Sequence, residues 1–179
     1  SKDAILPGAP QLYEHIENNV LIDTKFGDQA LTDQAFAKAS HVVEHEFYIQ
    51  RVTGVTMEPR SALGCYDADA GKFTLIAGSG GAVRQQSEIA AVLGIDTSDI
   101  RVISPDVGGN FGTRNRVYIE FGLVLFAAKK INRPVKFTAT RSESFLTDYQ
   151  GRDLVTNIAL ALDGNGKFLG LKCDNISNV

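Results

Sequence analysis

The feature that most constrains the fold is a regular alternation of side chains that begins at residue 154. A polar turn, Asp163-Gly164-Asn165-Gly166, ends this run, and a further segment follows from Lys167 to Asp174. A period of two indicates a strand, and a turn of this composition predicts a β-hairpin. Because little chain follows, we expect a lone hairpin with an unpaired edge, which favours a dimer or higher oligomer. The residues that share one face are Leu154, Thr156, Ile158, Leu160 and Leu162.

Two further regions carry strand signals. Alternation from His41 to Gln50 predicts a half-buried strand. The segments Arg60 to Tyr66 and Lys72 to Ala77 flank a polar, glycine-containing turn, which predicts a second hairpin. Ahead of them, Thr32 or Asp33 offers a side-chain oxygen that would cap a short helix through Ala39.

The middle of the chain alternates between helix and strand signals. Ala82 to Leu93 has a helical apolar stripe and is followed by Gly94, a usual helix end. Strands are expected at Ile100 to Ser104 and Val135 to Thr140, on either side of a longer helix that begins near Arg116. The buried face of this helix is predicted to contain Val117, Phe121, Val124, Leu125 and Ala128.

These elements predict an α+β fold, an antiparallel sheet with helices packed on one face, as part of a larger domain. Residues 1–31 read as an extended lead-in, and residues 32–179 as a partial domain. A length of 179 residues is enough to bury a core. We expect the chain to be a fragment of a larger protein, because it ends without a helix or other element that would close the sheet.

Composition excludes several classes of partner. The net charge of -3 gives no basic excess for nucleic acid, and no apolar run is long enough to span a membrane. Cys65 and Cys173 lack the spacing of a metal site or disulfide framework and are expected to be buried free thiols in a cytoplasmic protein. The histidines are expected to be structural or solvated: His15, His41 and His45.

A glycine-rich loop between Ile103 and Asn115 is the main candidate site. Gly108, Gly109 and Gly112 surround the aromatic Phe111, and glycine allows both positive φ and close approach of a ligand. Backbone amides at the start of a following helix would bind an anion. The alternative is a tight turn with no ligand.

Five motifs stand in a fixed order along the chain. Together they resemble the large, molybdopterin-binding part of the molybdenum hydroxylases, the family of xanthine dehydrogenase, aldehyde oxidase and aerobic carbon monoxide dehydrogenase. The resemblance covers the chain from about Phe47 onward. The motifs are Met57-Glu58-Pro59-Arg60, Gly78-Ser79-Gly80-Gly81, the loop Pro105 to Gly112, Arg133-Pro134-Val135 and Gly151-Arg152-Asp153.

The resemblance implies that a molybdenum-molybdopterin cofactor contacts this loop through backbone amides near Phe111 and Gly112. Asn110 stands where the family has a third glycine, and asparagine tolerates left-handed backbone. Gly80 stands where the family has a glutamine that binds an oxygen ligand of molybdenum, so that donor is missing. The implied cofactor-binding residues are Gly80, Gly81, Gly108, Gly109, Asn110, Phe111 and Gly112.

Three further residues are interpreted through the same resemblance. Asn115 replaces a substrate-binding glutamate of xanthine-oxidising members, which argues against a purine but allows a carbonyl or amide substrate. Arg152 matches an arginine that faces the substrate, or else it pairs with Asp153 or Asp148 at the surface. Arg114 is a phosphate contact or, more simply, a solvated loop arginine.

The family's hydroxylation also requires a glutamate general base, which the resemblance places beyond Val179. No catalytic residue is therefore expected in this chain, which alone would be inactive. The resemblance implies an oxidoreductase that acts on a small carbonyl, heterocyclic or carbon monoxide-like substrate with water as oxygen source. Its partners would be the remainder of the large subunit and subunits or domains that carry iron-sulfur clusters and FAD.

Two alternatives remain open. A non-catalytic scaffold domain of the same fold would explain Gly80 and Asn110. A dinucleotide-binding enzyme would use the Gly78–Gly81 turn, but Val83 stands where a third glycine belongs, and Asp106 is late for a ribose contact.

Overall fold

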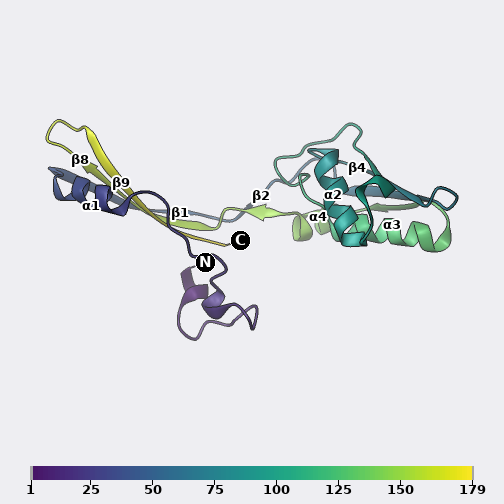
Figure 1. Cartoon of the computed structure of the whole chain (residues 1–179), viewed down its shortest axis with the longest axis horizontal. Coiled ribbons are helices and arrows are strands. Elements are labelled where there is room, and N and C mark those ends of the chain that lie inside the picture. The colour runs from purple at the N-terminus through teal and green to yellow at the C-terminus, as the bar shows by residue number, and fades with distance from the viewer. Residues whose placement is uncertain (1, 179) are drawn as a thin grey trace. The chain divides into compact units, whose positions relative to one another are not determined.

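A computed structural model describes residues 2–178 of the chain (Figure 1). The chain folds into two compact units. Thr53–Gln150 form one, which we call the central unit, and the chain up to Val52 and from Gly151 onward forms the other, the flanking unit. The division into a lead-in, residues 1–31, and a cofactor domain, residues 32–179, stays a prediction.

The central unit contains a four-stranded sheet with the order β5-β4-β3-β6. The predicted second hairpin is confirmed, since β3 (Ser61–Asp67) pairs antiparallel with β4 (Lys72–Ala77). On its other side β3 pairs antiparallel with β6 (Val135–Thr138). The pair of β4 with β5 (Ile100–Ile103) is parallel, with a helix in the connection between the two strands.

Three α-helices belong to the central unit: α2 (Ala82–Leu93), α3 (Ile119–Ile131) and α4 (Arg141–Thr147). Helix α3 packs so closely on β3 that a Cβ at Gly64 would lie 2.7 Å from the backbone of Val124, which explains the glycine. The predicted face of α3 is buried at its four helical positions. The resulting core consists of Ala62, Phe73, Leu75, Ala77, Ile89, Ala90, Ile100, Tyr118, Phe121, Val124 and Leu125.

The ends of these helices follow from local chemistry. Helix α2 ends at Gly94, as predicted, with a left-handed φ of 65°. Helix α4 begins with a capping box, in which the Thr140 side chain accepts from the Glu143 amide and the Glu143 carboxylate accepts from the Thr140 amide.

The start of α3 differs from the prediction. The helix begins at Ile119 rather than near Arg116, because Tyr118 is extended, with φ -118° and ψ 155°. Residues 116–118 therefore separate the glycine-rich loop from the helix. The helix N-terminus cannot supply the loop's donors, so any ligand binding by the loop depends on the loop's own amides.

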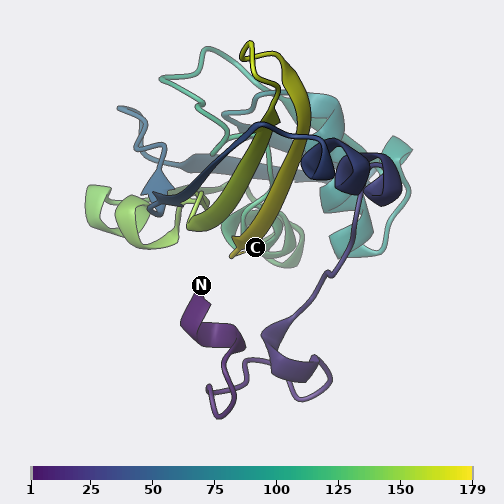
Figure 2. The ribbon, with the colours of Figure 1, turned by 90° about the vertical axis from the view of Figure 1, so that its left-hand side faces the viewer.

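The flanking unit contains a three-stranded antiparallel sheet with the order β1-β8-β9 (Figure 2). The predicted terminal hairpin is confirmed as β8 (Leu154–Leu162) and β9 (Phe168–Ser177). It is not a lone hairpin, because β1 (His41–Ile49) pairs with β8 along its whole length. Two short strands, β2 (Val52–Thr53) and β7 (Gln150–Gly151), form a separate pair.

Helix α1 (Gln29–Ala37) contacts β9 in the flanking unit. Asp28 caps it by accepting from the Leu31 amide at 2.9 Å, so the helix begins earlier than a Thr32 or Asp33 cap would allow. A Cβ at Gly170 would lie 2.9 Å from the Ala35 side chain. The 3-10 helices of the chain are η1 (Lys2–Ile5), η2 (Glu17–Asn19) and η3 (Thr97–Asp99).

Two expectations about burial are wrong. All nine residues of β1 are exposed, although its alternation predicted a half-buried strand, because helix α1 of the same unit packs on β9 instead. Cys173 is exposed and Cys65 is intermediate, so neither thiol is fully buried, and both are free. No helix within the described residues is long and apolar enough to cross a membrane.

Candidate functional site

The glycine-rich loop is tied to the segment before β3 at Gly108. The Gly108 amide donates to Glu58 Oε2 at 2.7 Å, and the Glu58 amide donates to the Gly108 carbonyl at 3.3 Å. A Cβ at Gly108 would lie 2.5 Å from the Glu58 Cβ. Only glycine allows the two segments to approach this closely.

The backbone of the loop reverses repeatedly through left-handed conformations. Gly109 has φ 112°, Phe111 has φ 50° and Gly112 has φ 92°. Asn110 does not take the left-handed conformation that asparagine tolerates, and the bulky Phe111 takes it instead. Such a conformation costs an aromatic residue about 1–3 kcal/mol and persists only where the surroundings enforce it. Phe111 is 77% exposed, so burial of its side chain does not enforce this conformation.

Asn110 organises the loop through its side chain. Its Oδ1 accepts from the amides of Gly112 and Arg114, each at 3.1 Å. Its carbonyl accepts from the Thr113 amide at 2.9 Å and from Thr113 Oγ1 at 2.8 Å. Asparagine commonly stabilises turns by bonding to the backbone a few residues onward, which explains its use here in place of glycine.

The structure brings Asn110, Asn115 and Gly80 together. Asn110 Nδ2 donates to Asn115 Oδ1 at 2.9 Å. The Gly80 amide donates to the Arg114 carbonyl at 3.1 Å. A Cβ at Gly80 would lie 2.0 Å from Asn115 Oδ1 and 2.3 Å from Asn110 Nδ2, so the two carboxamides fill the space that a side chain at position 80 would need.

Arg114 is buried rather than solvated, and only 2% of it is exposed. Its Nη2 donates to Thr56 Oγ1 and to the Glu58 carbonyl, each at 2.6 Å. Its Nη1 lies 3.5 Å from Asp148 Oδ1. The expectation of a solvated loop arginine is therefore wrong, and Arg114 instead anchors the loop to the protein interior.

A second buried arginine shares the same carboxylate. Arg60 forms an ion pair with Asp148 and another with Glu120, at 2.6 Å. Burial lowers the pKa of Arg60, but the hydrogen bonds with Glu120 and Asp148 outweigh it and raise the pKa overall. The Arg60 guanidinium also lies 4.2 Å from the centre of the Tyr118 ring, and burial raises the pKa of Tyr118.

The turn before α2 is held by a glutamine. The side chain of Gln85 is fully buried, and its Nε2 donates to the carbonyls of Gly78, Arg114 and Arg116 at 3.3, 3.5 and 3.4 Å. Gln85 therefore connects the Gly78–Gly81 turn to the far end of the loop. Sequence reasoning missed this role, as it missed the roles of Thr56, Glu58, Arg60 and Asp148. Only the Met57–Arg60 motif marked part of the network.

Three successive amides of the loop remain unpaired. Within residues 2–178, the N–H groups of Gly109, Asn110 and Phe111 donate to no protein acceptor. A Cβ built at Gly81 or at Gly112 would meet nothing within 4 Å, so space is open beside the loop. Successive backbone amides in alternating conformations form concave sites for anionic or oxo ligands. The loop residues thus fit an oxygen-bearing group.

Arg152 belongs to the flanking unit and is exposed, with a left-handed φ of 73°. It forms no ion pair with another residue in the described part of the chain. Asp153 instead pairs with Arg51 at 3.1 Å, and Asp148 pairs with the two buried arginines. The surface pairing considered for Arg152 is therefore wrong, and its role toward a substrate stays a prediction.

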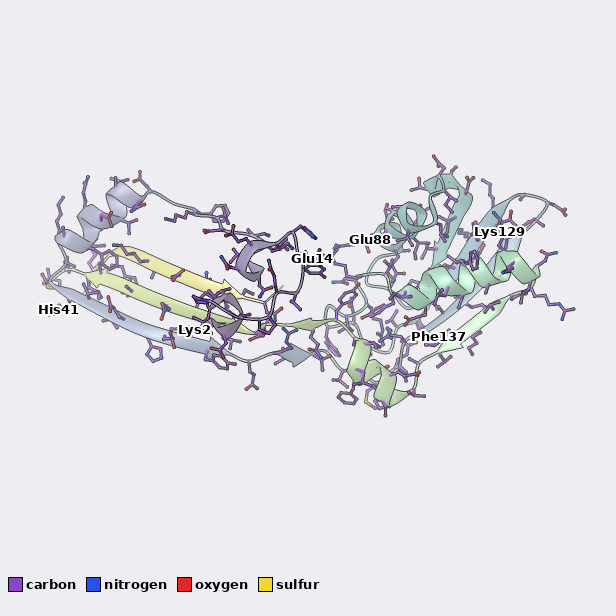
Figure 3. The ribbon with its side chains drawn as sticks, turned by 90° about the horizontal axis from the view of Figure 1, so that it is seen from below. Lys2, Glu14, His41, Glu88, Lys129 and Phe137 are labelled. Atoms are coloured by element: carbon purple, nitrogen blue, oxygen red, sulfur yellow. The ribbon has the colours of Figure 1, made fainter. Side chains whose placement is uncertain are left out.

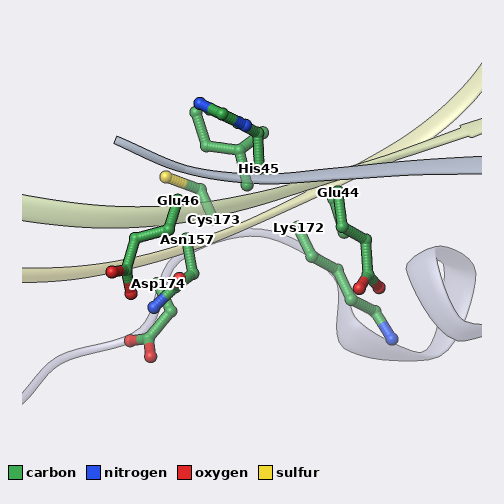
Figure 4. Close-up of a pocket in the computed structure, with 9 residues that line it drawn as sticks. Glu44, His45, Glu46, Asn157, Lys172, Cys173 and Asp174 are labelled. Atoms are coloured by element: carbon green, nitrogen blue, oxygen red, sulfur yellow. The ribbon is translucent and has the colours of Figure 1, made fainter. Parts of the chain in front are cut away.

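A shallow hollow on the flanking sheet is a poor alternative site (Figure 4). Its side chains project to opposite faces of the sheet, with His45 and Cys173 on one and Glu44 and Lys172 on the other (Figure 4). Among residues 2–178, no group of three or more histidine, cysteine or acidic side chains is arranged to hold a metal ion. The loop in the central unit remains the better candidate.

Comparison with known proteins gives a consistent result. Residues 12–179 match the family described as the molybdopterin cofactor-binding domain. The chain is 32% identical over 158 residues to the gamma subunit of the 6-hydroxypseudooxynicotine dehydrogenase complex of Paenarthrobacter nicotinovorans, which covers 88% of this chain. It is 29% identical over 188 residues to the carbon monoxide dehydrogenase large chain of Hydrogenophaga pseudoflava, which covers 98%.

The fold is also similar to that of solved structures. Reconstituted carbon monoxide dehydrogenase from Oligotropha carboxidovorans superposes with a TM-score of 0.78 at 29% identity, over 83% of this chain and 18% of that one. The chain spans only 19% and 23% of the lengths of the two curated relatives. The predicted α+β class is confirmed, with the parallel β4–β5 pair as an addition to its antiparallel pairings.

Proposed function

Because the chain belongs to the molybdopterin cofactor-binding domain family, we propose that its glycine-rich loop binds an oxygen atom at the molybdenum end of that cofactor. The observation that carries this proposal is the set of unpaired amides at Gly109, Asn110 and Phe111, beside the open space at Gly112. Backbone donors held in place before a ligand arrives stabilise negative charge without rearrangement. Gly80 and Gly81 border the same loop.

The protein that contains this chain acts, in our proposal, as an oxidoreductase that hydroxylates or oxidises a small molecule with water as oxygen source. The cofactor supplies the two-electron redox chemistry, and iron-sulfur and FAD partners carry the electrons away. The names of the relatives favour carbon monoxide or a nicotine-derived compound as the class of substrate. The general base and the remaining pocket belong to other parts of that protein.

Within this chain, Asn115 and Arg152 are the proposed substrate contacts. Asn115 Oδ1 is engaged by Asn110, which leaves the Asn115 Nδ2 to donate to a carbonyl or ring nitrogen. Arg152 offers an exposed guanidinium, which would stabilise negative charge on a substrate oxygen.

The direct test is the molybdenum and pterin content of the purified complete protein, measured beside that of residues 1–179 alone. We expect stoichiometric cofactor in the complete protein and none in the isolated segment, which would be inactive. A complete protein that lacks both molybdenum and pterin, expressed in a host that loads a related enzyme, would contradict the proposal.

A scaffold domain without cofactor is the second candidate. It is favoured by the Asn110 carboxamide, which occupies the amides of Gly112 and Arg114, and by the filled space above Gly80. The same cofactor measurement separates the two candidates, because a scaffold purifies without metal.

We further propose an oligomeric, cytoplasmic protein. The edges of the flanking sheet at β1 and β9 have no strand partner among the described residues, and exposed edges favour association. Free cysteines agree with a reducing compartment. A monodisperse monomer in light scattering of the complete protein would contradict the oligomer.

A further inference from the structure

Asn110 stands out because one side chain satisfies several loop groups at once. Its Oδ1 accepts from two backbone amides, at Gly112 and Arg114, and its Nδ2 donates to Asn115. A carboxamide has two acceptor sites and two donor protons, so most of its hydrogen-bonding capacity is used inside the loop. Glycine at this position would leave both amides free.

The loop that Asn110 organises is fixed at both ends. Gly108 is bonded to Glu58, and the Arg114 side chain is bonded to the Glu58 carbonyl and lies beside Asp148. Between these anchors, the bonds made within the loop are those of the Asn110 side chain and carbonyl, together with the Asn115 amide, which donates to the Gly112 carbonyl at 3.4 Å. From outside the loop, the Gly80 amide donates to the Arg114 carbonyl and Tyr118 Oη donates to the Thr113 carbonyl. Within the loop, the bonds that span Phe111, with its left-handed φ, are thus made by Asn110.

The amides of residues 109–112 and 114 fall into two sets. Those of Gly112 and Arg114 donate to the Asn110 carboxamide, whereas those of Gly109, Asn110 and Phe111 donate to no acceptor within residues 2–178. At Gly112 and Arg114, the Asn110 carboxamide oxygen takes the place that a ligand oxygen would otherwise take. A ligand can therefore bind only the amides of Gly109, Asn110 and Phe111.

We propose that Asn110 is a positioning residue that determines which loop amides meet the cofactor. Its carboxamide withdraws the amides of Gly112 and Arg114 from ligand binding and holds those of Gly109, Asn110 and Phe111 in one arrangement. The ligand would be an oxygen of the molybdenum cofactor, a point that rests on the function proposed above. Groups held in their bound conformation beforehand lose less entropy on binding, so the cofactor is retained longer.

The test is hydrogen exchange with single-amide resolution on the complete protein, with and without cofactor. In the unmodified protein, the amides of Gly112 and Arg114 are protected in both states, and those of residues 109–111 only with cofactor bound. In Asn110→Ala, exchange at Gly112 and Arg114 rises about tenfold, in line with the loss of one hydrogen bond at each. Asn165→Ala, in the exposed turn between β8 and β9, leaves the exchange of the loop unchanged.

Asn110→Asp distinguishes positioning from simple folding defects. Its carboxylate still accepts from both amides, so protection at Gly112 and Arg114 returns, although the bond to Asn115 is lost. The rate at which molybdenum leaves the protein rises about tenfold in Asn110→Ala. In Asn110→Asp it also rises, because the added negative charge repels the ligand oxygen while the loop stays ordered.

Two results would overturn the inference. One is exchange at Gly112 and Arg114 that does not change in Asn110→Ala, and the other is protection of these two amides only when cofactor is bound. If no preparation contains cofactor, the proposed function fails, but the comparison of unmodified protein with Asn110→Ala still decides whether Asn110 organises the loop.

Discussion

Glu58 and Gly108 exchange two hydrogen bonds, one through the Glu58 carboxylate at 2.7 Å and one between backbone groups at 3.3 Å. The carboxylate accepts a backbone amide, a bond in which the acceptor is charged and therefore strong. Through this pair, the segment that leads into β3 fixes the first glycine of the glycine-rich loop. The anchor lies opposite Arg114, which binds the Glu58 carbonyl.

Replacing Gly108 by alanine should destabilise the protein by about 1–3 kcal/mol, because the new Cβ would lie 2.5 Å from the Glu58 Cβ. Urea unfolding measures the change. Gly122→Ala is the matched control, since its Cβ would meet only Val92 at 3.8 Å, and alanine is favoured over glycine within α3. Equal destabilisation by both variants would contradict the close approach at Gly108.

Asp148→Ala should cost about 3–5 kcal/mol, because it leaves the buried guanidinium groups of Arg60 and Arg114 without their shared carboxylate. Thermal and urea unfolding report the loss. Asp33→Ala removes a carboxylate from an exposed ion pair with Lys172 and should change little. If the two variants unfold alike, the buried network does not stabilise the central unit.

Gly80→Ala should displace the Asn110–Asn115 bond, since a Cβ at position 80 falls within 2.3 Å of both carboxamides. We expect a loss of about 1–2 kcal/mol, from overpacking and the broken bond. Removing the Asn115 side chain first should relieve much of this cost. A double-mutant cycle of Gly80→Ala with Asn115→Ala measures the coupling, and additive effects would show that the three residues do not share one space.

Glu88, labelled on α2 in Figure 3, should stabilise the folded protein at neutral pH and lose this effect in acid. The hydrogen bond from Arg84 lowers its pKa below the ordinary value of 4.5, with help from the Val117 amide. Because the pKa is lower in the folded protein, the stabilisation is complete above pH 4.5 and is lost as the pH falls through the folded pKa.

Glu88→Gln should therefore be less stable than the unmodified protein at neutral pH, by an amount that stays constant down to pH 4.5 and then shrinks. Unfolding midpoints between pH 7 and pH 2 measure this difference, with Glu14→Gln in the lead-in as the control. A difference that grows toward low pH would contradict the assignment.

The sequence predicted the strands and hairpins well, and for a clear physical reason. Alternation and glycine turns act over a few residues, so β3, β4, β8 and β9 were identifiable from local pattern alone. Helix α1 was misplaced because Asp28, Thr32 and Asp33 are all acceptable caps, and only the structure shows which one binds an amide.

The site was harder to predict, since its contacts join residues far apart in the chain. Arg114 is buried because Thr56 and Asp148 surround it, and neither lies near it in sequence. Likewise, no local pattern shows that the carboxamides of Asn110 and Asn115 meet above Gly80. The glycine-rich loop could be located from sequence, but the side chains that hold it could not.

The pairing of β1 with β8 has a consequence for biosynthesis. These strands exchange hydrogen bonds along their whole length, yet all of residues 53–150 lie between them in the chain. On the ribosome, β1 emerges long before its partner and waits with an unpaired edge, whereas the central unit is continuous and can fold as it appears. Once folded, the central unit shortens the loop that the sheet must close. The order of translation thus allows the glycine-rich loop to take its structure before the flanking sheet is complete.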